Sequence, residues 1–172
     1  LASCDRKTLS GVRDYAIITV LFDTGVRAGE LISMGLPDWK NYLVRVDGKT
    51  GVRYVPLGLG SLQALERYTR KWGVTNDALW MGKYGSLTAS GVLQMVRRRC
   101  VGTSVYPTKG VHAFRRAAAA QMKRIGMNDS DIMEIMGWGE VTMLRRYIAS
   151  VSSELAQSAH RRFSPADSAL SH

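Results

Sequence analysis

One β-hairpin pattern lies within a chain whose remaining apolar periodicity is helical, and this contrast limits the fold class. The runs "YLVRV" and "VRYVPL" are rich in β-branched residues, and "DGKTG" between them has the composition of a turn. They predict an antiparallel hairpin over residues 42–57. The segments on either side carry apolar residues at helical spacing. We therefore expect a mainly α domain with a small antiparallel β-sheet, which is an α+β fold.

Eight segments predict helices. The first, "SGVRDYAIITVLFDTG", has Ser10 as its candidate cap and ends at Gly25. The others are "RAGELISM", "SLQALERYTRKW", "TASGVLQMVRRRC" with a Thr88 cap, the stretch from "GVHAFRRAAAA" to Gly126, "DSDIMEIMG", "VTMLRRYIA" and "SSELAQSAHRRF". We predict one folded domain over residues 1–163 and a frayed, flexible tail over residues 164–172.

The charge balance points to a polyanionic partner. Lysine and arginine total 24 against 14 acidic residues, a net charge of +10 in 172 residues. Nucleic acid is the first candidate for so basic a domain. A membrane surface would also attract it, but the sequence has no apolar run long enough for a span and no signal peptide. The first residue is Leu1, so we expect a piece of a longer protein.

Cysteine and histidine are too sparse for a disulfide framework or a metal site. Cys4 and Cys100 form no C-x-x-C motif, and the three histidines are scattered along the chain. A reducing cytosol is the expected compartment, and no metal or other cofactor is expected.

The stretch "GVHAFRRAAAA" places His112 three residues before Arg115, at a predicted helix start. Residues three apart share one face of a helix. Free N–H groups and the helix dipole favour an anion at that end, so the pair predicts a phosphate site. The alanines allow neighbouring helices to approach closely. The alternative is that Arg115 and Arg116 lie on a solvated face.

Two further cations precede this stretch. Arg27, in "DTGVRAGEL", lies between strongly apolar segments, and a partly buried arginine needs an anion. Glu30 could be that partner, and the alternative is a plain ion pair without function. Lys49 lies at the predicted hairpin tip, where glycines let the backbone approach a ligand, although lysine is also common in turns.

The segment "MGWGEVTMLRRYI" holds the last candidates. Trp138 lies between two glycines, and Tyr147 follows nine residues later. A helical tyrosine beside Leu144 and Ile148 can also be a packing residue.

Taken in order, these motifs resemble the tyrosine recombinase, or phage integrase, family from about Gly11 to Arg162. The resemblance implies a catalytic set of Arg27, Lys49, His112, Arg115, Trp138 and Tyr147, with Glu30 as the support of the first arginine. Trp138 stands where most relatives carry a second histidine, and Gly29 where many carry serine. The resemblance also implies an upstream DNA-clamping domain, absent here, and a tetramer on double-stranded DNA. The isolated domain is expected to be a monomer.

The same resemblance implies a mechanism. Tyr147 attacks a DNA phosphodiester, while Arg27 and Arg115 offset charge on the non-bridging oxygens and His112 donates to the same oxygens. The indole of Trp138 is a donor only, so it binds phosphate without shuttling protons. Lys49 is then the expected general acid for the leaving 5′-oxygen. The product is a 3′-phosphotyrosyl link, formed without a metal.

This predicts a site-specific recombinase or integrase of a phage or other mobile element, in the cytoplasm of a prokaryotic host. A type IB topoisomerase would use the same chemistry. A DNA-binding module without catalysis is a second alternative. A helix-turn-helix regulator, reading DNA with the helices around Ile132 and Arg145, leaves Arg27 and Lys49 unexplained.

Overall fold

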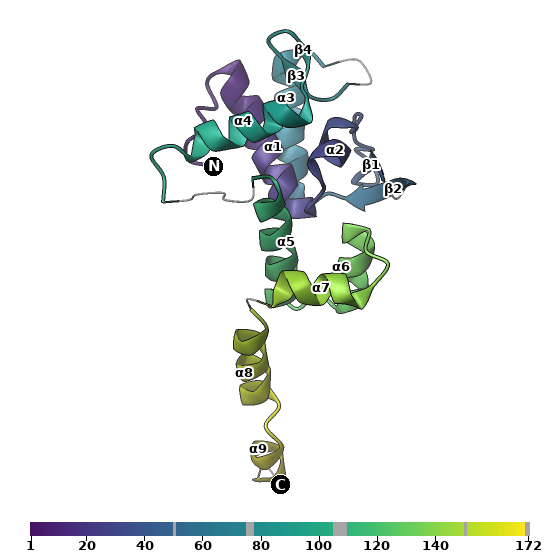
Figure 1. The fold of residues 1–172 in the computed structure, drawn as a ribbon, viewed down its shortest axis with the longest axis vertical. Coiled ribbons are helices and arrows are strands. Elements are labelled where there is room, and N and C mark those ends of the chain that lie inside the picture. Colours follow the sequence, from purple (N-terminus) through teal and green to yellow (C-terminus); the bar gives the residue numbers. More distant parts are fainter. Residues whose placement is uncertain (50, 75–77, 105–109, 150, 171–172) are drawn as a thin grey trace.

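The computed structural model describes residues 1–49, 51–74, 78–104, 110–149 and 151–170. It is mainly helical with two small antiparallel hairpins, which confirms the predicted fold class (Figure 1). The helices are α1 Leu9–Thr24, α2 Ala28–Ile32, α3 Leu59–Trp72, α4 Ala89–Cys100, α5 His112–Arg124, α6 Asp129–Met136, α7 Val141–Ile148, α8 Ser152–Arg162 and α9 Pro165–Leu170. The strands are β1 Leu43–Gly48, β2 Gly51–Pro56, β3 Met81–Gly82 and β4 Gly85–Ser86. Thr50 of the predicted turn and residues 171–172 of the predicted tail lie outside the described residues.

Most of the predicted helix ends are confirmed, and one cap is wrong. The Thr88 hydroxyl accepts a hydrogen bond from the Gly91 N–H, as expected for the cap of α4. Helix α1 is capped by Thr8, which has an extended backbone and accepts from the Gly11 N–H at 3.0 Å. Ser10, the predicted cap, therefore lies within the first turn. The pair β3–β4, only two residues per strand, was not predicted.

The core has two parts joined by helix α5. The larger part gathers apolar side chains from α1, α3, α4 and the β1–β2 hairpin, and the smaller part lies among α5, α6 and α7. Helix α5 packs on α1 at one end of this arrangement and on α6 and α7 at the other (Figure 1). Its alanines Ala118 and Ala119 are almost completely buried, so they allow the close approach that the sequence indicated.

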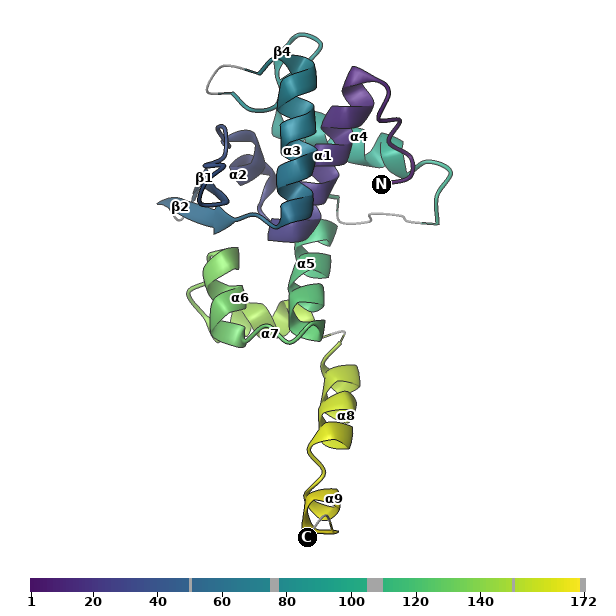
Figure 2. The same cartoon turned by 180° about the vertical axis from the view of Figure 1, so that it is seen from behind.

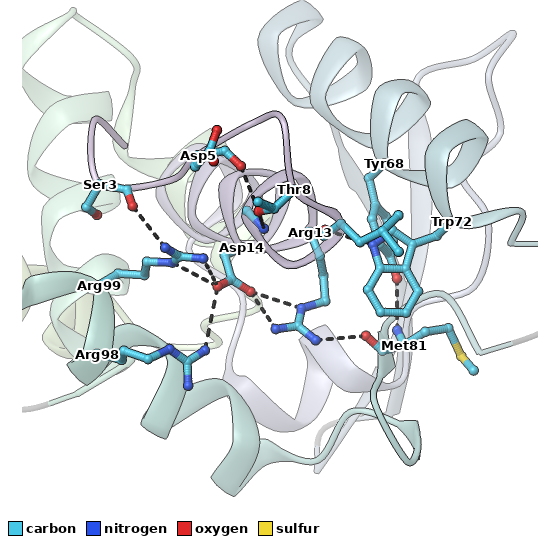
Figure 3. Close-up of polar contacts among 12 residues, drawn as sticks. Ser3, Asp5, Thr8, Arg13, Asp14, Tyr68, Trp72, Met81, Arg98 and Arg99 are labelled. Carbon is cyan, nitrogen blue, oxygen red and sulfur yellow. Dashed lines mark hydrogen bonds and ion pairs between the residues drawn. The ribbon is translucent and has the colours of Figure 1, made fainter.

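An unpredicted ionic cluster fastens the start of α1 (Figure 3). The buried carboxylate of Asp14 accepts hydrogen bonds from Arg13 at 2.9 and 2.7 Å and from Arg99 at 2.8 Å. Arg13 also donates to the Met81 carbonyl, and Arg99 to the Ser3 carbonyl. The cluster thus ties the N-terminal segment and α1 to α4 and β3.

The C-terminal helices project from the rest of the molecule. Both views show α8 and α9 pointing away from the helices that surround α5 (Figures 1 and 2). Neither helix has a buried residue, and only Leu155 packs in part against the smaller core. Residues Pro165–Leu170 of the predicted tail form α9, since a proline is well suited to the first turn of a helix, and the flexibility of this tail stays a prediction.

Within the ranges that the structure describes, no helix is long and apolar enough to cross a bilayer. The same residues contain no group of three or more histidine, cysteine, aspartate or glutamate side chains placed to hold a metal ion. Cys4 and Cys100 form no disulfide.

Candidate active site

The turn after α1 places the first candidate arginine. Gly25 ends the helix in the left-handed conformation, with φ of 63°, and a Cβ there would lie 2.6 Å from the Met136 methyl. Only glycine fits both constraints. The chain then turns into α2, and Arg27 stands at its N-cap. The Arg27 side chain is 32% exposed, so part of it remains open to a ligand.

Glu30 lies beneath Arg27 and is 1% exposed. Its Oε1 accepts from the Arg27 guanidinium at 2.8 Å, and its Oε2 from the Arg27 backbone N–H at 2.8 Å. This confirms the predicted pair, but Glu30 has a second partner, since Arg53 on β2 donates to the two oxygens at 2.7 and 3.1 Å. Burial alone would raise the pKa of Glu30, but the bonds from Arg53 and Arg27 lower it to about 2.

Arg115 joins the two parts of the core. It is 1% exposed, and it donates to the Gly25 carbonyl at 2.7 Å and to the Met136 carbonyl. These carbonyls lie two residues before Arg27 and two residues before Trp138. Burial, followed by repulsion from Arg27, lowers the pKa of Arg115 to about 10, so the group stays protonated at neutral pH. The solvated-face alternative is therefore wrong for Arg115, whereas Arg116 is exposed.

Arg115, Trp138 and Tyr147 contact one another in series, and the two rings are tilted at 45° to each other. The Arg115 guanidinium carbon lies 4.9 Å from the centre of the Trp138 ring, and the Trp138 and Tyr147 ring centres are 4.7 Å apart. Trp138 is 6% exposed, and its indole Nε1 is buried without a hydrogen-bond partner among the described residues. A buried N–H without a partner costs about 1–3 kcal/mol, and an indole N–H can donate to an acceptor atom of a ligand.

His112 lies beside Tyr147 at the surface. A pocket of about 460 Å³ is lined by His112, Arg116, Met143, Arg146 and Tyr147. The start of α5 and the last turns of α7 therefore form one open, basic hollow around the tyrosine. Arg116, for which a solvated face was the alternative, is exposed and lines this hollow.

Lys49 is the candidate that the structure does not bring into contact with the others. It is exposed at the tip of the β1–β2 hairpin, and no contact joins it to Tyr147 among the described residues. Its neighbour Gly48 packs on Glu30, because a Cβ at Gly48 would lie 2.9 Å from the Glu30 Cγ. The hairpin is also fixed to α2, where the Ser33 hydroxyl donates to the Asp47 carbonyl and accepts from its N–H.

The arrangement brings guanidinium and N–H donors together with a phenol hydroxyl. Arg27 and Arg115 lie close enough to repel each other, and the Trp138 ring, whose indole N–H has no partner among the described residues, contacts both Arg115 and the Tyr147 ring. Donors of this kind are suited to a phosphate that gains charge when attacked.

Comparison with known proteins agrees with this geometry. The sequence profile of the phage integrase family matches residues 1–154. Over 146 residues the chain is 34% identical to y4rA of Sinorhizobium fredii, an integrase/recombinase by name, covering 80% of this chain and 36% of the relative. It is 27% identical to tyrosine recombinase XerC of Bifidobacterium longum, covering 83% of this chain and 44% of XerC.

Solved recombinases share the fold. The crystal structure of XerA recombinase superposes with a TM-score of 0.79 at 23% identity, over 91% of this chain and 58% of XerA. XerH bound to a palindromic difH substrate gives 0.71 at 20% identity, over 89% of this chain and 46% of XerH. The chain spans less than half the length of the two curated relatives above. It belongs to the phage integrase family of tyrosine recombinases.

Proposed function

We propose that this chain is the catalytic domain of a site-specific DNA recombinase. It cleaves and rejoins double-stranded DNA through a 3′-phosphotyrosyl intermediate, for integration or excision of a phage or other mobile element. Relatives with the same fold include proteins solved with DNA substrates, which supports DNA as the partner. Its net charge of +10 also favours DNA. Because the relatives are bacterial, we place the reaction in the cytoplasm of a prokaryotic cell.

The Tyr147 hydroxyl loses its proton to water, and its oxygen bonds to phosphorus while the bond from phosphorus to the 5′-oxygen breaks. Arg27, Arg115 and the Trp138 N–H offset charge on the non-bridging oxygens, with His112 as a further donor. Lys49 gives a proton to the leaving 5′-oxygen. A 5′-hydroxyl from another strand reverses the step and joins the strands.

The observation that carries this proposal is the series of contacts from Arg115 to Trp138 to Tyr147. The indole N–H of Trp138 has no hydrogen-bond partner among the described residues. Arg115 is 1% exposed, so the scissile phosphate must uncover its guanidinium when DNA binds. Lys49 is exposed on a hairpin tip, so its ammonium group is open to a bound DNA strand.

We further propose that four protomers assemble on DNA and that α8 docks on a neighbouring protomer. The exposure of α8 supports this, because Leu155, Ala159 and Phe163 form an apolar stripe with little cover, and Phe163 is 71% exposed. Without DNA the chain is then a monomer.

Covalent trapping tests the proposed function without knowledge of the target site. A pool of duplexes with randomised arms and one nick is mixed with the protein, so that a short fragment carrying the 5′-hydroxyl diffuses away after cleavage. We expect denaturant-resistant protein–DNA adducts, enriched in one sequence, with the wild-type protein and none with Tyr147→Phe. Adducts formed equally by Tyr147→Phe, or no adducts at all, contradict the proposal.

A second assay separates recombination from topoisomerase activity. The sequence recovered from the adducts is placed twice in a supercoiled plasmid. We expect exchange between the two sites. Relaxation of the plasmid without any exchange indicates a type IB topoisomerase instead.

A further inference from the structure

Arg53 is a mostly buried arginine that the proposed chemistry does not use. It lies on β2 opposite Val46 of β1, and its side chain is 16% exposed. Alternation along the strand places it on the same face as the buried Val55. A charged group on that face is costly unless an anion pairs with it.

The anion is Glu30, and Arg53 binds it as a two-pronged fork. One Arg53 nitrogen donates to Oε1 at 2.7 Å and the other to Oε2 at 3.1 Å. Arg27 supplies the other donor to each oxygen, one from its guanidinium and one from its backbone. With each oxygen holding two donors, the carboxylate has one fixed orientation, and the Arg27 guanidinium is held by a single one of its nitrogens.

The Arg53–Glu30 pair also touches the turns that carry two other candidates. A Cβ at Gly137 would lie 3.1 Å from the Arg53 Nε, and Gly137 directly precedes Trp138. On the other side Glu30 packs on Gly48, which directly precedes Lys49. Arg53 therefore lies where α2, the hairpin and the turn between α6 and α7 meet.

Stability alone does not account for this residue. A buried ion pair gains little over well-packed apolar side chains, because desolvation of both charges opposes the attraction. An apolar residue beside Val55 would fill the same face of β2. Arg53 instead fixes the orientation of Glu30 and adds a positive charge. Three arginines, Arg27, Arg53 and Arg115, surround the single negative charge of Glu30, so the site keeps a net charge of two positive charges.

We propose that Arg53 is a positioning residue of the cleavage reaction, which holds Glu30 in a two-pronged ion pair so that Arg27 keeps a free edge for a non-bridging oxygen of the scissile phosphate. This rests on the proposed function. Without Arg53, Arg27 is the one ionic partner left to Glu30 among the described residues, and Glu30 draws the whole Arg27 guanidinium away from the phosphate.

The test compares two substrates in single-turnover cleavage with saturating protein. Both are the nicked duplex recovered from the trapping selection, one with the ordinary scissile phosphate and one with a methylphosphonate, which replaces a charged oxygen by a methyl group. We expect Arg53→Met to cleave the ordinary substrate about 100-fold more slowly than wild type, the loss typical of one missing oxyanion donor. On the uncharged methylphosphonate the loss should fall below about tenfold, because Arg27 has less charge to offset.

Arg45→Met is the matched control. Arg45 lies on the neighbouring strand with its side chain 52% exposed, and it is expected to leave the ratio between the two substrates unchanged. A second variant, Arg53→Lys, is used in case Arg53→Met does not fold. It keeps the positive charge but cannot bind both oxygens of Glu30 at once, and it should show the same change in the ratio of cleavage rates on the two substrates. The double variant Arg53→Met, Glu30→Gln should be no slower than the slower single variant, since Arg53 acts through Glu30.

The proposed role of Arg53 is overturned if its variants lose the same factor in cleavage rate on both substrates, or if the losses of the two single variants add in the double variant. Cleavage by the wild-type protein still upholds the proposed function in that case. If the Arg53 variants are instead rescued by a substrate with sulfur as the bridging 5′-atom, Arg53 acts on Lys49 and the proposal is wrong. Absence of any wild-type adduct overturns the proposed function and this inference together.

Discussion

The guanidinium carbon of Arg115 lies 4.9 Å from the centre of the Trp138 ring, although the two residues come from different elements of the fold. A cation over an indole face is attracted by the ring, and more strongly where water is excluded, as it is here. Most relatives are expected to carry histidine where this chain has Trp138. The tryptophan thus contacts Arg115 through its ring face and Tyr147 through a tilted ring pair, and its N–H has no partner among the described residues.

Trp138→Phe separates that donor from the packing. We expect cleavage in the trapped-adduct assay to slow about 10- to 100-fold, because a phosphate donor is lost. The free energy of unfolding in urea should change by no more than about 1 kcal/mol, since loss of ring contacts is offset by removal of a buried unpaired N–H. Trp138→His, which restores a donor, should cleave faster than Trp138→Phe. Equal rates for these two variants, or a loss of stability large enough to explain the slow cleavage, assign Trp138 to packing alone.

The ionised Glu30 carboxylate should make the free energy of unfolding depend on pH. Its pKa in the folded protein, about 2, is below its ordinary value of 4.5, so its contribution is full above pH 4.5 and is lost as the pH falls toward 2. The shift corresponds to about 3 kcal/mol. We expect the difference in unfolding free energy between wild type and Glu30→Gln to shrink between pH 5 and pH 2.5. A difference independent of pH over that range shows that Glu30 does not titrate in this way.

The sequence predicted Arg27 with Glu30 because the two are three residues apart, but it did not predict Arg53. Arg53 comes 23 residues after Glu30, and the contact depends on how the hairpin folds back on α2. Strand alternation was the available signal, because Arg53 shares a face with Val55. A buried arginine on that face requires an anion, and few buried acids are available.

The Asp14 cluster was missed for a similar reason. Arg13 and Asp14 are adjacent in sequence, and nothing in their local pattern distinguishes them from charged residues on the solvent-exposed side of a helix. Arg99, the second partner of Asp14, is 85 residues away from it on α4, and no local pattern predicts such a contact. In contrast, caps and turns such as Gly25 and Thr88 depend on local backbone chemistry, and the sequence predicted them correctly.

DNA affinity should depend steeply on salt. Each phosphate contact releases counterions, so the logarithm of the binding constant should fall linearly with the logarithm of salt concentration, with a slope of roughly −0.9 per contact. Titration of a fluorescent duplex over a salt series measures that slope. Arg116→Ala, at the pocket beside Tyr147, should reduce it by about one contact. A flat line contradicts a DNA partner.

Removal of residues 152–172 should separate assembly from chemistry. The deletion removes the exposed ion pair of Glu154 with Arg124 and the half-buried Leu155, and it keeps the buried Val151. The free energy of unfolding should therefore fall by only about 1–2 kcal/mol. Cleavage of a single nicked site should persist, while tetramers on DNA, measured by native gel and light scattering, should be lost. Unchanged tetramer formation shows that α8 does not dock between protomers.

Lys49→Ala should reveal whether the hairpin lysine is the general acid. On ordinary DNA it should cleave poorly, because the leaving 5′-oxygen needs a proton. When sulfur replaces that bridging oxygen, the leaving group is a thiolate, whose conjugate acid has a pKa of roughly 8.5. Such a leaving group needs no general acid. The sulfur substrate should therefore rescue Lys49→Ala.

The control variants should not be rescued by sulfur. Tyr147→Phe lacks the nucleophile. Arg27→Ala and Arg115→Ala should stay slow, because charge on the non-bridging oxygens still has to be offset. Excess EDTA should change none of these rates. If the sulfur substrate fails to rescue Lys49→Ala, the acid is another group, and His112, which lines the pocket beside Tyr147, is the next residue to test.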